Sequence, residues 1–450
     1  MTAAKRIAQS LTLPCGAVLP NRIGKSATQE GLATPLGHAS ELNVTLYRRW
    51  SEGGAGLLIS GDVMVDYSHR ERPGNIVIDD NGGIDALRRW AKAGQVAGNQ
   101  LWMQINQPGR QTPIDVQAHP MAPSANMAGL PPEGFGMPRA MTEAEILDLI
   151  ERFGRVAATA REAGFTGVQL HAAHGFMASS FLSPLCNTRD DAWGGSLENR
   201  ARFLIESLRA MRRAVGNDFA LSVKMNAADF HRGGFDMEQS MAVIAMLNAE
   251  SLDLLEISGG NYDAPAMIGA MGSGSPLARK KAERTLRREA YFMEYARRAR
   301  PIAAMPLMIT GGFRTLDAME AALEEDATDV IGLARPFCAS TDFPAKLLNG
   351  EATEVPMIEE TMLLDREAYI GKLDDRAFNL MESNMQLAWM YVQLTNLGEG
   401  KDIDWGLSLE RIAPGLCRSG SRRELARRAA QGKWYPRDDR FCTKRQFLGE

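Results

Sequence analysis

The sequence predicts a (β/α)8 barrel (TIM barrel) of the α/β class with a C-terminal helical extension. Three observations support this. Short apolar runs alternate with longer stretches of helical spacing, eight such runs occur before about residue 350, and the alternation stops there. Strands buried on both faces are continuously apolar, as these runs are. Eight strands that are each followed by a helix close into a barrel, and an open doubly wound sheet is the alternative.

The expected strands are short and are bounded by Gly, Pro or polar residues. In chain order they are Ile23–Thr28, Gly56–Gly61, Leu101–Ile105, Thr166–His171, Phe219–Met225, Asp253–Ser258, Pro306–Thr310 and Asp329–Leu333. Helical stripes of apolar residues follow them, beginning at Leu42, Ile84, Ile146, Leu197, Met241, Phe292, Met319 and Phe343. Thr142 and Glu145 have the spacing of a capping box, which predicts that the third of these helices begins there.

Two expected loops are too long for plain connections between a strand and a helix. Gln107–Ala140 is rich in Pro and Gly, and Gly259–Thr285 follows the sixth strand. Both follow strands on the side where barrel enzymes place their active sites. We therefore expect these loops to act as lids or binding loops.

The chain after the barrel has a different character. We expect residues 1–350 to form the barrel and residues 351–450 to form a helical extension, which contains a stripe of Met381, Met385, Ala388 and Val392. This stripe would pack on the barrel or on a partner subunit, so a homodimer is one of two expectations. The locally basic segment Arg418–Arg445 is either a solvated face or a site for an anionic partner.

Composition and charge are those of a soluble globular protein. The chain has 450 residues, of which 45% are apolar and 24% charged, and its net charge is −4. This balance does not favour a nucleic-acid partner, and no apolar run is long enough to predict a membrane span. Met1–Pro14 does not resemble a secretory signal. The five cysteines include no CxxC pair, so we expect a reducing cytoplasm and no zinc or iron–sulfur site.

The chemistry of a barrel collects at the carboxyl ends of its strands. In strand order, the residues expected there are Ser26, Ala27, Thr28, Gln29, Gly61, Gln104, His171, His174, Lys224, Ser258, Gly311, Gly312, Ala334 and Arg335. Gly311 and Gly312 would let backbone N–H groups approach a phosphate, which Arg335 could bind with two hydrogen bonds. Turn-forming glycines beside a salt-bridged arginine are the alternative.

Two histidines share an HxxH segment at the end of the fourth strand. No Cys, Asp or Glu cluster completes a metal site around His171 and His174, so we predict no metal. Buried structural histidines are one alternative. The interpretation we favour is a pair of N–H donors that hold and polarise a carbonyl or anionic oxygen.

Lys224 and Gln104 are polar residues within otherwise apolar strands. A desolvated lysine in a barrel mouth either stabilises a bound anion or forms a Schiff base. Gln104 can both donate and accept, which suits an amide-like edge such as the pyrimidine ring of a flavin. Gly272-Ser273-Gly274 follows no strand and begins no helix, so it does not predict a dinucleotide fingerprint.

At this point the residues resemble a known family. HAAHGFMASSFLSPLCNTRDDAWGGSLENRARF, at His171–Phe203, is similar to the signature of the Old Yellow Enzyme family of FMN-dependent NAD(P)H oxidoreductases. Shorter matches are Asn21-Arg22-Ile23, GGAGLLISG (Gly53–Gly61), QINQPGR (Gln104–Arg110), ITGGF (Ile309–Phe313) and GLARPF (Gly332–Phe337). KMNAADF (Lys224–Phe230) resembles the branch of the bacterial 2,4-dienoyl-CoA reductases. The cluster-binding cysteines and second nucleotide domain of larger members are missing, which implies FMN alone.

The resemblance implies a role for each matched position, with FMN as cofactor and NADH or NADPH as reductant. Cofactor-binding residues would be Ser26, Ala27, Thr28, Gly61, Gln104, Lys224, Gly311, Gly312, Ala334 and Arg335. Among them, Gln104 would bond the pyrimidine edge, and Lys224 would lie near N1 and O2. His171 and His174 would bind the carbonyl oxygen of an enone, or a phenol. Hydride would pass from NAD(P)H to the flavin and then to the substrate.

Three positions depart from the family pattern. Phe176 occupies the place of the usual tyrosine proton donor, so Tyr262, Tyr67 or water would have to serve instead. Gln29 stands where a Thr or Cys usually tunes the flavin, and Gln107 replaces a histidine common in this branch. Gln29, Phe176 and Tyr262 are expected to line the substrate pocket.

The function expected from these residues is transfer of hydride from NAD(P)H through FMN to an activated alkene, a quinone or a related acceptor. Three alternatives stay open. The first is an FMN-dependent dehydrogenase or demethylase of an amine or alcohol. The second is a lyase that uses Lys224 as a Schiff-base amine, and the third is a catalytically silent scaffold.

Overall fold

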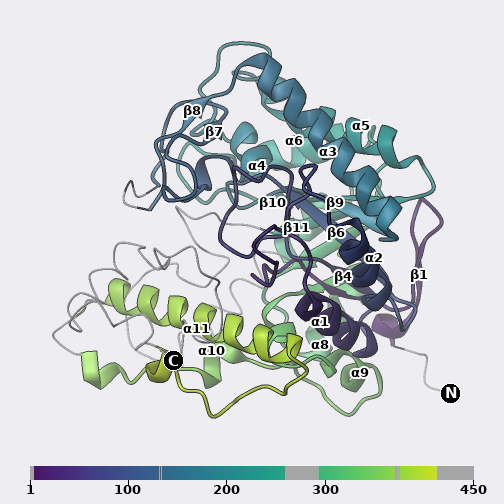
Figure 1. The fold of residues 1–450 in the computed structure, drawn as a ribbon. Helices are drawn as coiled ribbons and strands as arrows, with labels where there is room; N and C mark the ends of the chain where they lie inside the picture. Colours follow the sequence, from purple (N-terminus) through teal and green to yellow (C-terminus); the bar gives the residue numbers. More distant parts are fainter. Residues whose placement is uncertain are drawn as a thin grey trace.

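The computed structural model describes residues 5–130, 132, 134–258, 293–369, 373 and 375–412. Within them, parallel strands form a closed barrel surrounded by helices (Figure 1). The barrel strands are β3 (Ile23–Lys25), β4 (Leu57–Ile59), β6 (Gln100–Asn106), β9 (Gly167–Ala172), β10 (Ala220–Asn226), β11 (Leu254–Ser258), β12 (Leu307–Thr310) and β13 (Val330–Leu333). The ring closes because β4 pairs with both β3 and β6. The predicted barrel is confirmed, and each expected strand overlaps an observed one.

Helices follow the strands as the apolar stripes predicted. They are α1 (Glu41–Glu52), α2 (Ile84–Ala93), α3 (Glu143–Ala163), α5 (Leu197–Val215), α6 (Met237–Leu247), α8 (Leu316–Glu324) and α9 (Phe343–Leu348). The capping box that precedes α3 forms as expected. The Thr142 N–H donates to the Glu145 carboxylate at 2.9 Å, and the Thr142 hydroxyl accepts from the Glu145 N–H at 3.3 Å.

Several short elements were not expected from the sequence. They are η1 (Arg6–Ala8), the antiparallel pair β1 (Leu11–Thr12) and β2 (Val18–Leu19), β5 (Val63–Met64), η2 (Gly109–Gln111), β7 (Met121–Ala122), β8 (Arg139–Ala140), α4 (Met177–Leu182) and η4 (Arg335–Cys338). Leu13 and Leu19 of the β1–β2 hairpin pack against Trp102 and Met308 inside the barrel. The hairpin therefore closes the amino end of the barrel with an apolar floor.

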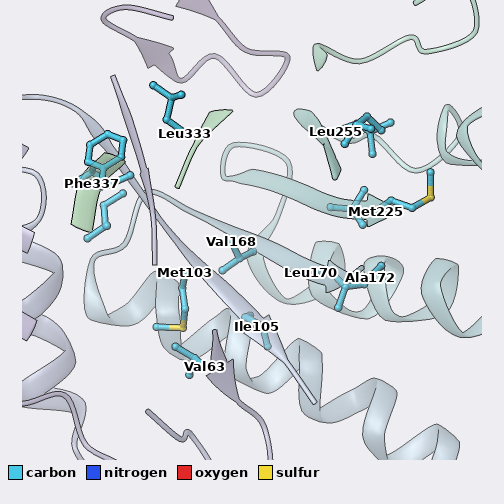
Figure 2. Packing of buried hydrophobic residues seen from close by; sticks show 14 of the residues in the cluster. Val63, Met103, Ile105, Val168, Leu170, Ala172, Met225, Leu255, Leu333 and Phe337 are labelled. Atoms are coloured by element: carbon cyan, nitrogen blue, oxygen red, sulfur yellow. The ribbon is translucent and has the colours of Figure 1, made fainter. Parts of the chain in front are cut away.

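Side chains alternate between the outside and the inside of the barrel wall along each strand. Met103 and Ile105 of β6 and Val168 and Leu170 of β9 belong to the outer core, which packs on the helices (Figure 2). The residues between them point inward. Because successive side chains of a strand point to opposite faces, this register decides which residues reach the barrel interior.

The described part of the C-terminal extension contacts the barrel. It contains α10 (Ile358–Thr361), η5 (Arg366–Tyr369) and α11 (Asp375–Gly398), and α11 runs beside α1 (Figure 1). Arg49 of α1 forms an ion pair with Asp402 at 3.1 Å. The expected basic segment and the Gly259–Thr285 loop lie outside the described residues. In the part of the chain that the structure describes, no helix is long and apolar enough to cross a membrane.

Candidate active site

The barrel interior changes from apolar to polar one step above its floor. Trp102, Ala220, Leu254 and Met308 belong to the floor cluster. Two residues further along the same strands come Gln104, Ser222, Glu256 and Thr310. All four side chains are buried and hydrogen-bonded to one another or to neighbouring strands. The period of the strands therefore places a polar layer across the barrel.

A buried ion pair occupies the centre of this layer. Lys224 Nζ lies 3.1 Å from Glu256 Oε1, and the two side chains are 4% and 0% exposed. The register of β10 and β11 sets Lys224 beside Glu256. Lys224 also donates to Ser26 Oγ at 2.9 Å. Lys224, a lysine buried in an apolar strand, is thus paired with a carboxylate.

Gln104 joins the same network through a second glutamine. Gln104 Nε2 donates to Gln169 Oε1 at 2.7 Å, and Gln169 Nε2 donates to Glu256 Oε2 at 2.9 Å. Ser26, Gln104 and Lys224 were each expected at the cofactor on the basis of the family resemblance. The structure brings all three into one hydrogen-bonded chain.

The two histidines at the end of β9 are neutral. Burial lowers the pKa of His171 well below its usual value, and the nearby His174 and Lys224 lower it further. Burial and Lys224 do the same to the pKa of His174. His171 Nδ1 accepts from the Ala173 N–H at 3.2 Å, so its proton lies on Nε2. The His171 ring can therefore donate from Nε2 without being charged.

His174 is held differently from His171. Its backbone is left-handed, with φ 62°, and its N–H donates to Asn226 Oδ1 at 3.1 Å. Its Nε2 lies 2.9 Å from Ser258 Oγ. The two rings are edge to face, with centroids 5.2 Å apart. A strained backbone that the surroundings hold in place is typical of functional sites.

Phe176 lies directly against His171. The ring centroids are 4.8 Å apart and nearly perpendicular, and the Phe176 side chain is buried. Phe176 is also the N-cap of α4, where it offers no side-chain cap. The position expected for a tyrosine hydroxyl thus carries an aromatic edge without a proton to give.

The ends of β3 and β4 approach each other closely. A Cβ on Gly61 would lie 2.2 Å from Glu30 Oε2 and 2.8 Å from the Thr28 carbonyl oxygen, so only glycine fits. Gln29 Nε2 donates to Asp62 Oδ1 at 2.7 Å. Ala27 and Thr28 are both half-buried beside this contact. The structure therefore brings Gly61 to the Ala27–Gln29 segment, as the barrel register predicted.

Glycines and an arginine lie side by side at the ends of β12 and β13. Thr310 pairs with Gly332, which sets Gly311 and Gly312 next to Ala334 and Arg335. Gly311 and Gly312 have φ values of 132° and 89°, which side chains other than glycine rarely adopt. Arg335 is half-buried at the start of η4. Backbone N–H groups in such a turn form concave sites for anions.

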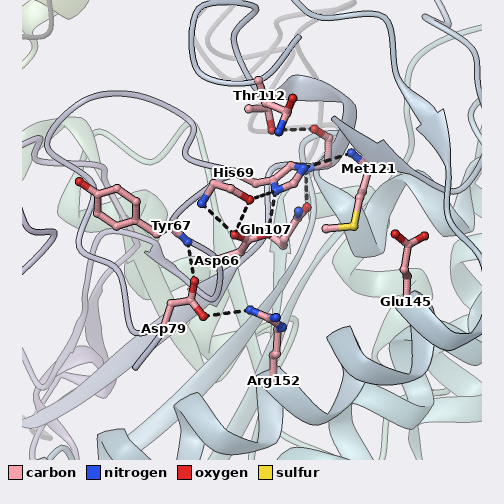
Figure 3. A network of polar contacts seen from close by, with 12 residues as sticks. Asp66, Tyr67, His69, Asp79, Gln107, Thr112, Met121, Glu145 and Arg152 are labelled. Atoms are coloured by element: carbon pink, nitrogen blue, oxygen red, sulfur yellow. Dashed lines mark hydrogen bonds and ion pairs between the residues drawn. The ribbon is translucent and has the colours of Figure 1, made fainter. Parts of the chain in front are cut away.

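The residues suggested as replacements for the missing tyrosine are not all available. Tyr67 donates its hydroxyl proton to the Pro35 carbonyl oxygen at 2.6 Å, and its ring lies in the loop shown in Figure 3. Gln107, which was expected to stand in place of a histidine, is not one of these candidates. It is buried, and its Oε1 accepts from the Gly109 N–H at 2.5 Å. Tyr262 lies outside the described residues. Tyr67 is therefore committed to its loop.

Sequence reasoning missed Gln169, Glu256, Asn106 and Asp62. Gln169 precedes His171 by two residues, and Glu256 precedes Ser258 by two, so both share the inward face of their strands. Reading the alternation residue by residue would have found them. Asn106 follows Gln104 by two residues, and its Nδ2 donates to Asp62 Oδ2 at 2.7 Å. Asp62 follows the end of its strand, so strand periodicity gives no signal for it.

Comparison with known proteins gives the family. Residues 15–354 match the NADH:flavin oxidoreductase / NADH oxidase family. An NADH-dependent flavin oxidoreductase of Hypocrea jecorina (strain QM6a) is 33% identical over 358 residues, which are 75% of this chain and 88% of that protein. One from Talaromyces variabilis is 35% identical over 357 residues, which are 75% and 85% of the two chains.

Other relatives are longer than this chain. An NADH-dependent flavin oxidoreductase of Neonectria sp. (strain DH2) is 34% identical over 373 residues, and the match covers 78% of this chain but 48% of the relative. Among solved structures, an Old Yellow Enzyme homologue from Zymomonas mobilis has a TM-score of 0.66 at 22% identity, covering 82% of this chain and 99% of that one. The latter likeness shows the fold.

The match to the family extends over the whole barrel, and the barrel of the structure is the one that Old Yellow Enzyme homologues share. This chain belongs to the NADH:flavin oxidoreductase / NADH oxidase family, a family of flavin oxidoreductases that use FMN and NADH.

Proposed function

We propose that this enzyme passes hydride from NADH, through FMN, to an electron-poor small molecule, with quinones as the favoured acceptors and activated alkenes as the second class. The observation that carries this proposal is the neutral His171 beside the proton-free Phe176, next to the Lys224 layer. When bound, FMN supplies the two-electron chemistry that the protein side chains lack.

The donor set of the site fits FMN in kind. The polar layer offers an amide at Gln104 and a cation at Lys224, which suit the polar edge of a flat ring. The left-handed Gly311 and Gly312 turn offers backbone N–H groups for a phosphate beside Arg335. We assign the binding of FMN to Ser26, Ala27, Thr28, Gly61, Gln104, Lys224, Gly311, Gly312, Ala334 and Arg335.

His171 and His174 would hold the acceptor. A neutral imidazole that donates a hydrogen bond from Nε2 polarises a carbonyl oxygen without itself carrying a positive charge. His171 meets this requirement because Ala173 engages its Nδ1. His174 is positioned by Asn226 and Ser258 to support the same oxygen. These contacts favour acceptors with a carbonyl group.

Phe176 decides between the two classes of acceptor. Reduction of an alkene requires a proton at carbon, which a positioned acid supplies far faster than water does. Reduction of a quinone places both protons on oxygen, where water exchanges them readily. Phe176 supplies no proton, and the Tyr67 hydroxyl already donates to Pro35. The site therefore favours quinones, with Gln29 and Tyr262 as further residues of the proposed pocket.

The setting of the enzyme is also a proposal. Cys15, Cys186 and Cys338 are free thiols in the described part of the chain, which supports a reducing cytoplasm. We retain the division into a barrel at 1–350 and an extension at 351–450, and a homodimer as an open arrangement. NADPH is retained as a second reductant beside NADH.

A visible spectrum followed by anaerobic titration tests the proposal. Purified protein should be yellow, bleach with NADH, and regain its colour faster with menadione than with 2-cyclohexenone. Titration with NADPH gives the nucleotide preference. A yellow protein that only an amine or alcohol bleaches would support the dehydrogenase alternative. Colourless protein that FMN does not reconstitute would overturn the proposal.

A further inference from the structure

The Lys224–Glu256 pair is neutral as a unit, and the family resemblance assigned no role to Glu256. Four donors meet its carboxylate. Oε1 accepts from Ser26 at 2.5 Å, from Thr310 at 2.7 Å and from Lys224 at 3.1 Å, while Oε2 accepts from Gln169 at 2.9 Å. Burial opposes ionisation, but the Lys224 charge and these hydrogen bonds outweigh it and lower the pKa of Glu256. Glu256 is therefore an anion that balances Lys224.

The same carboxylate also orients the two glutamines. An ionised carboxylate only accepts hydrogen bonds, so Gln169 must turn its Nε2 group toward Glu256. The Gln169 Oε1 atom then faces Gln104 and takes a hydrogen bond from Gln104 Nε2 at 2.7 Å. This leaves the Gln104 carbonyl oxygen for a donor outside the chain. The polarity of Gln104 is thus fixed from Glu256, two side chains away.

We propose that Glu256 is a positioning residue that sets the reduction potential of the bound FMN by balancing the charge of Lys224 and fixing the amide polarity of Gln104. The inference rests on the proposed function, in which Lys224 and Gln104 contact the flavin. Glu256 itself is not among the residues assigned to the cofactor, but it contacts two of them, Ser26 and Lys224.

The sign of the effect follows from the charges. A cation beside the flavin stabilises its reduced, anionic form and raises its potential. With Glu256 ionised at 3.1 Å, the net charge of the pair is zero, so the potential is held lower than Lys224 alone would set it. A lower potential makes the reduced flavin a stronger donor of hydride to its acceptor.

Three variants test the charge balance. Glu256→Gln should leave Lys224 as an unbalanced cation. Lys224→Met should leave Glu256 as an unbalanced anion, and the double variant should have neither charge. The measurement is the potential of the FMN-loaded protein, equilibrated with reference dyes. For Glu256→Gln we expect at least a tenfold rise in the equilibrium constant for reduction, about 30 mV for two electrons. Lys224→Met should shift it the opposite way, and the double variant should return to within about threefold of the parent.

Thr310→Val is the matched control, because it removes a hydrogen bond to Glu256 at 2.7 Å without changing any charge. It should shift the equilibrium constant less than about threefold. If Glu256→Gln does not fold, the proposal is still tested by the lowered potential of Lys224→Met and by the return of the double variant toward the parent value. An unchanged potential in FMN-loaded Glu256→Gln, or an equal shift in Thr310→Val, would overturn the inference alone. Parent protein that binds no FMN would instead overturn the proposed function.

Discussion

At the scale of single residues, His171 and His174 share a segment but have different hydrogen-bond partners. His171 Nδ1 is engaged by the backbone, which leaves Nε2–H as a donor. His174 Nε2 is already 2.9 Å from Ser258 Oγ. Both rings are neutral because burial lowers their pKa values. His171 is therefore the main hydrogen-bond donor to a ligand oxygen in the pocket.

The histidines should be separable by phenol binding. Replacing both with alanine should abolish the charge-transfer band of a bound phenol while FMN stays bound. His171→Ala alone should weaken phenol binding about tenfold to a hundredfold, since a hydrogen bond to a charged group contributes about 1.5–3 kcal/mol. His174→Ala should weaken it less. Titration with the phenol, followed by the intensity of this band, measures the affinity. A full band in the double variant would show that the two histidines do not bind the phenol.

Phe176 gives the second prediction at this scale. Phe176→Tyr would place a hydroxyl beside His171, whose ring lies 4.8 Å away. Because a positioned general acid contributes about a hundredfold or more, turnover of 2-cyclohexenone should rise at least about tenfold. Menadione turnover, which needs no acid, is the control and should stay within about twofold. An unchanged rate with cyclohexenone would mean that another group protonates the alkene.

Residue-scale prediction from sequence succeeded where a residue type was unusual for its strand. Lys224 and Gln104 stood out because they interrupt apolar runs, and the structure places both in the polar layer. Glu256 interrupts such a run too, but only Ser258, at the end of the same strand, was predicted at the barrel mouth. Asp62 could not be found at all, because its partners are Gln29, in the segment after β3, and Asn106, at the end of β6.

At the scale of elements, loops between strands and helices are held by side chains that the sequence does not pair. His69 Nδ1 lies 2.7 Å from Asp66 Oδ2, and His69 Nε2 accepts from the Met121 N–H at 3.2 Å (Figure 3). This joins the loop after β5 to β7 in the long insertion. Strand periods predicted the barrel, but such contacts join segments that no local pattern relates.

The Asp66–His69 pair predicts a pH-dependent stability. Burial opposes ionisation of Asp66, but hydrogen bonds from His69 and Ser68 lower its pKa to about 2. A carboxyl with a depressed pKa stabilises the fold above its unfolded pKa, near 4, and the effect is lost as pH falls toward about 2. Asp66→Asn should therefore cost about 2 kcal/mol near neutral pH.

Urea unfolding near pH 7 and near pH 3 measures how much Asp66→Asn lowers the free energy of unfolding. This loss should be smaller at the lower pH. Asp79→Asn is the matched control on the same loop. It removes a 2.9 Å ion pair with Arg152 whose side chains are 32% and 27% exposed, so it should cost at most about 1 kcal/mol. Equal losses at both pH values for Asp66→Asn would show that its charge is not what stabilises the loop.

At the scale of the whole molecule, α11 connects the C-terminal extension to the barrel at two places. Its length runs beside α1, where Arg49 reaches Asp402. Near the barrel mouth, the Arg72 guanidinium lies 3.7 Å from the centre of the Tyr391 ring. Trp389 is fully buried and donates to the Leu407 carbonyl oxygen at 3.0 Å. These contacts indicate that the extension and the barrel unfold together.

Trp389→Ala tests whether the extension and the barrel unfold together. Removing a fully buried tryptophan should cost about 3–5 kcal/mol, through lost burial and the cavity left behind. Because α11 packs on α1, far-UV circular dichroism and flavin fluorescence should report the same lowered midpoint. Trp405→Ala is the control, since Trp405 is 46% exposed although its ring lies 5.4 Å from that of Trp389. If Trp389→Ala produced an early transition while the flavin signal kept its midpoint, the extension would be a separate unit, and the barrel would not depend on α11 to hold its cofactor.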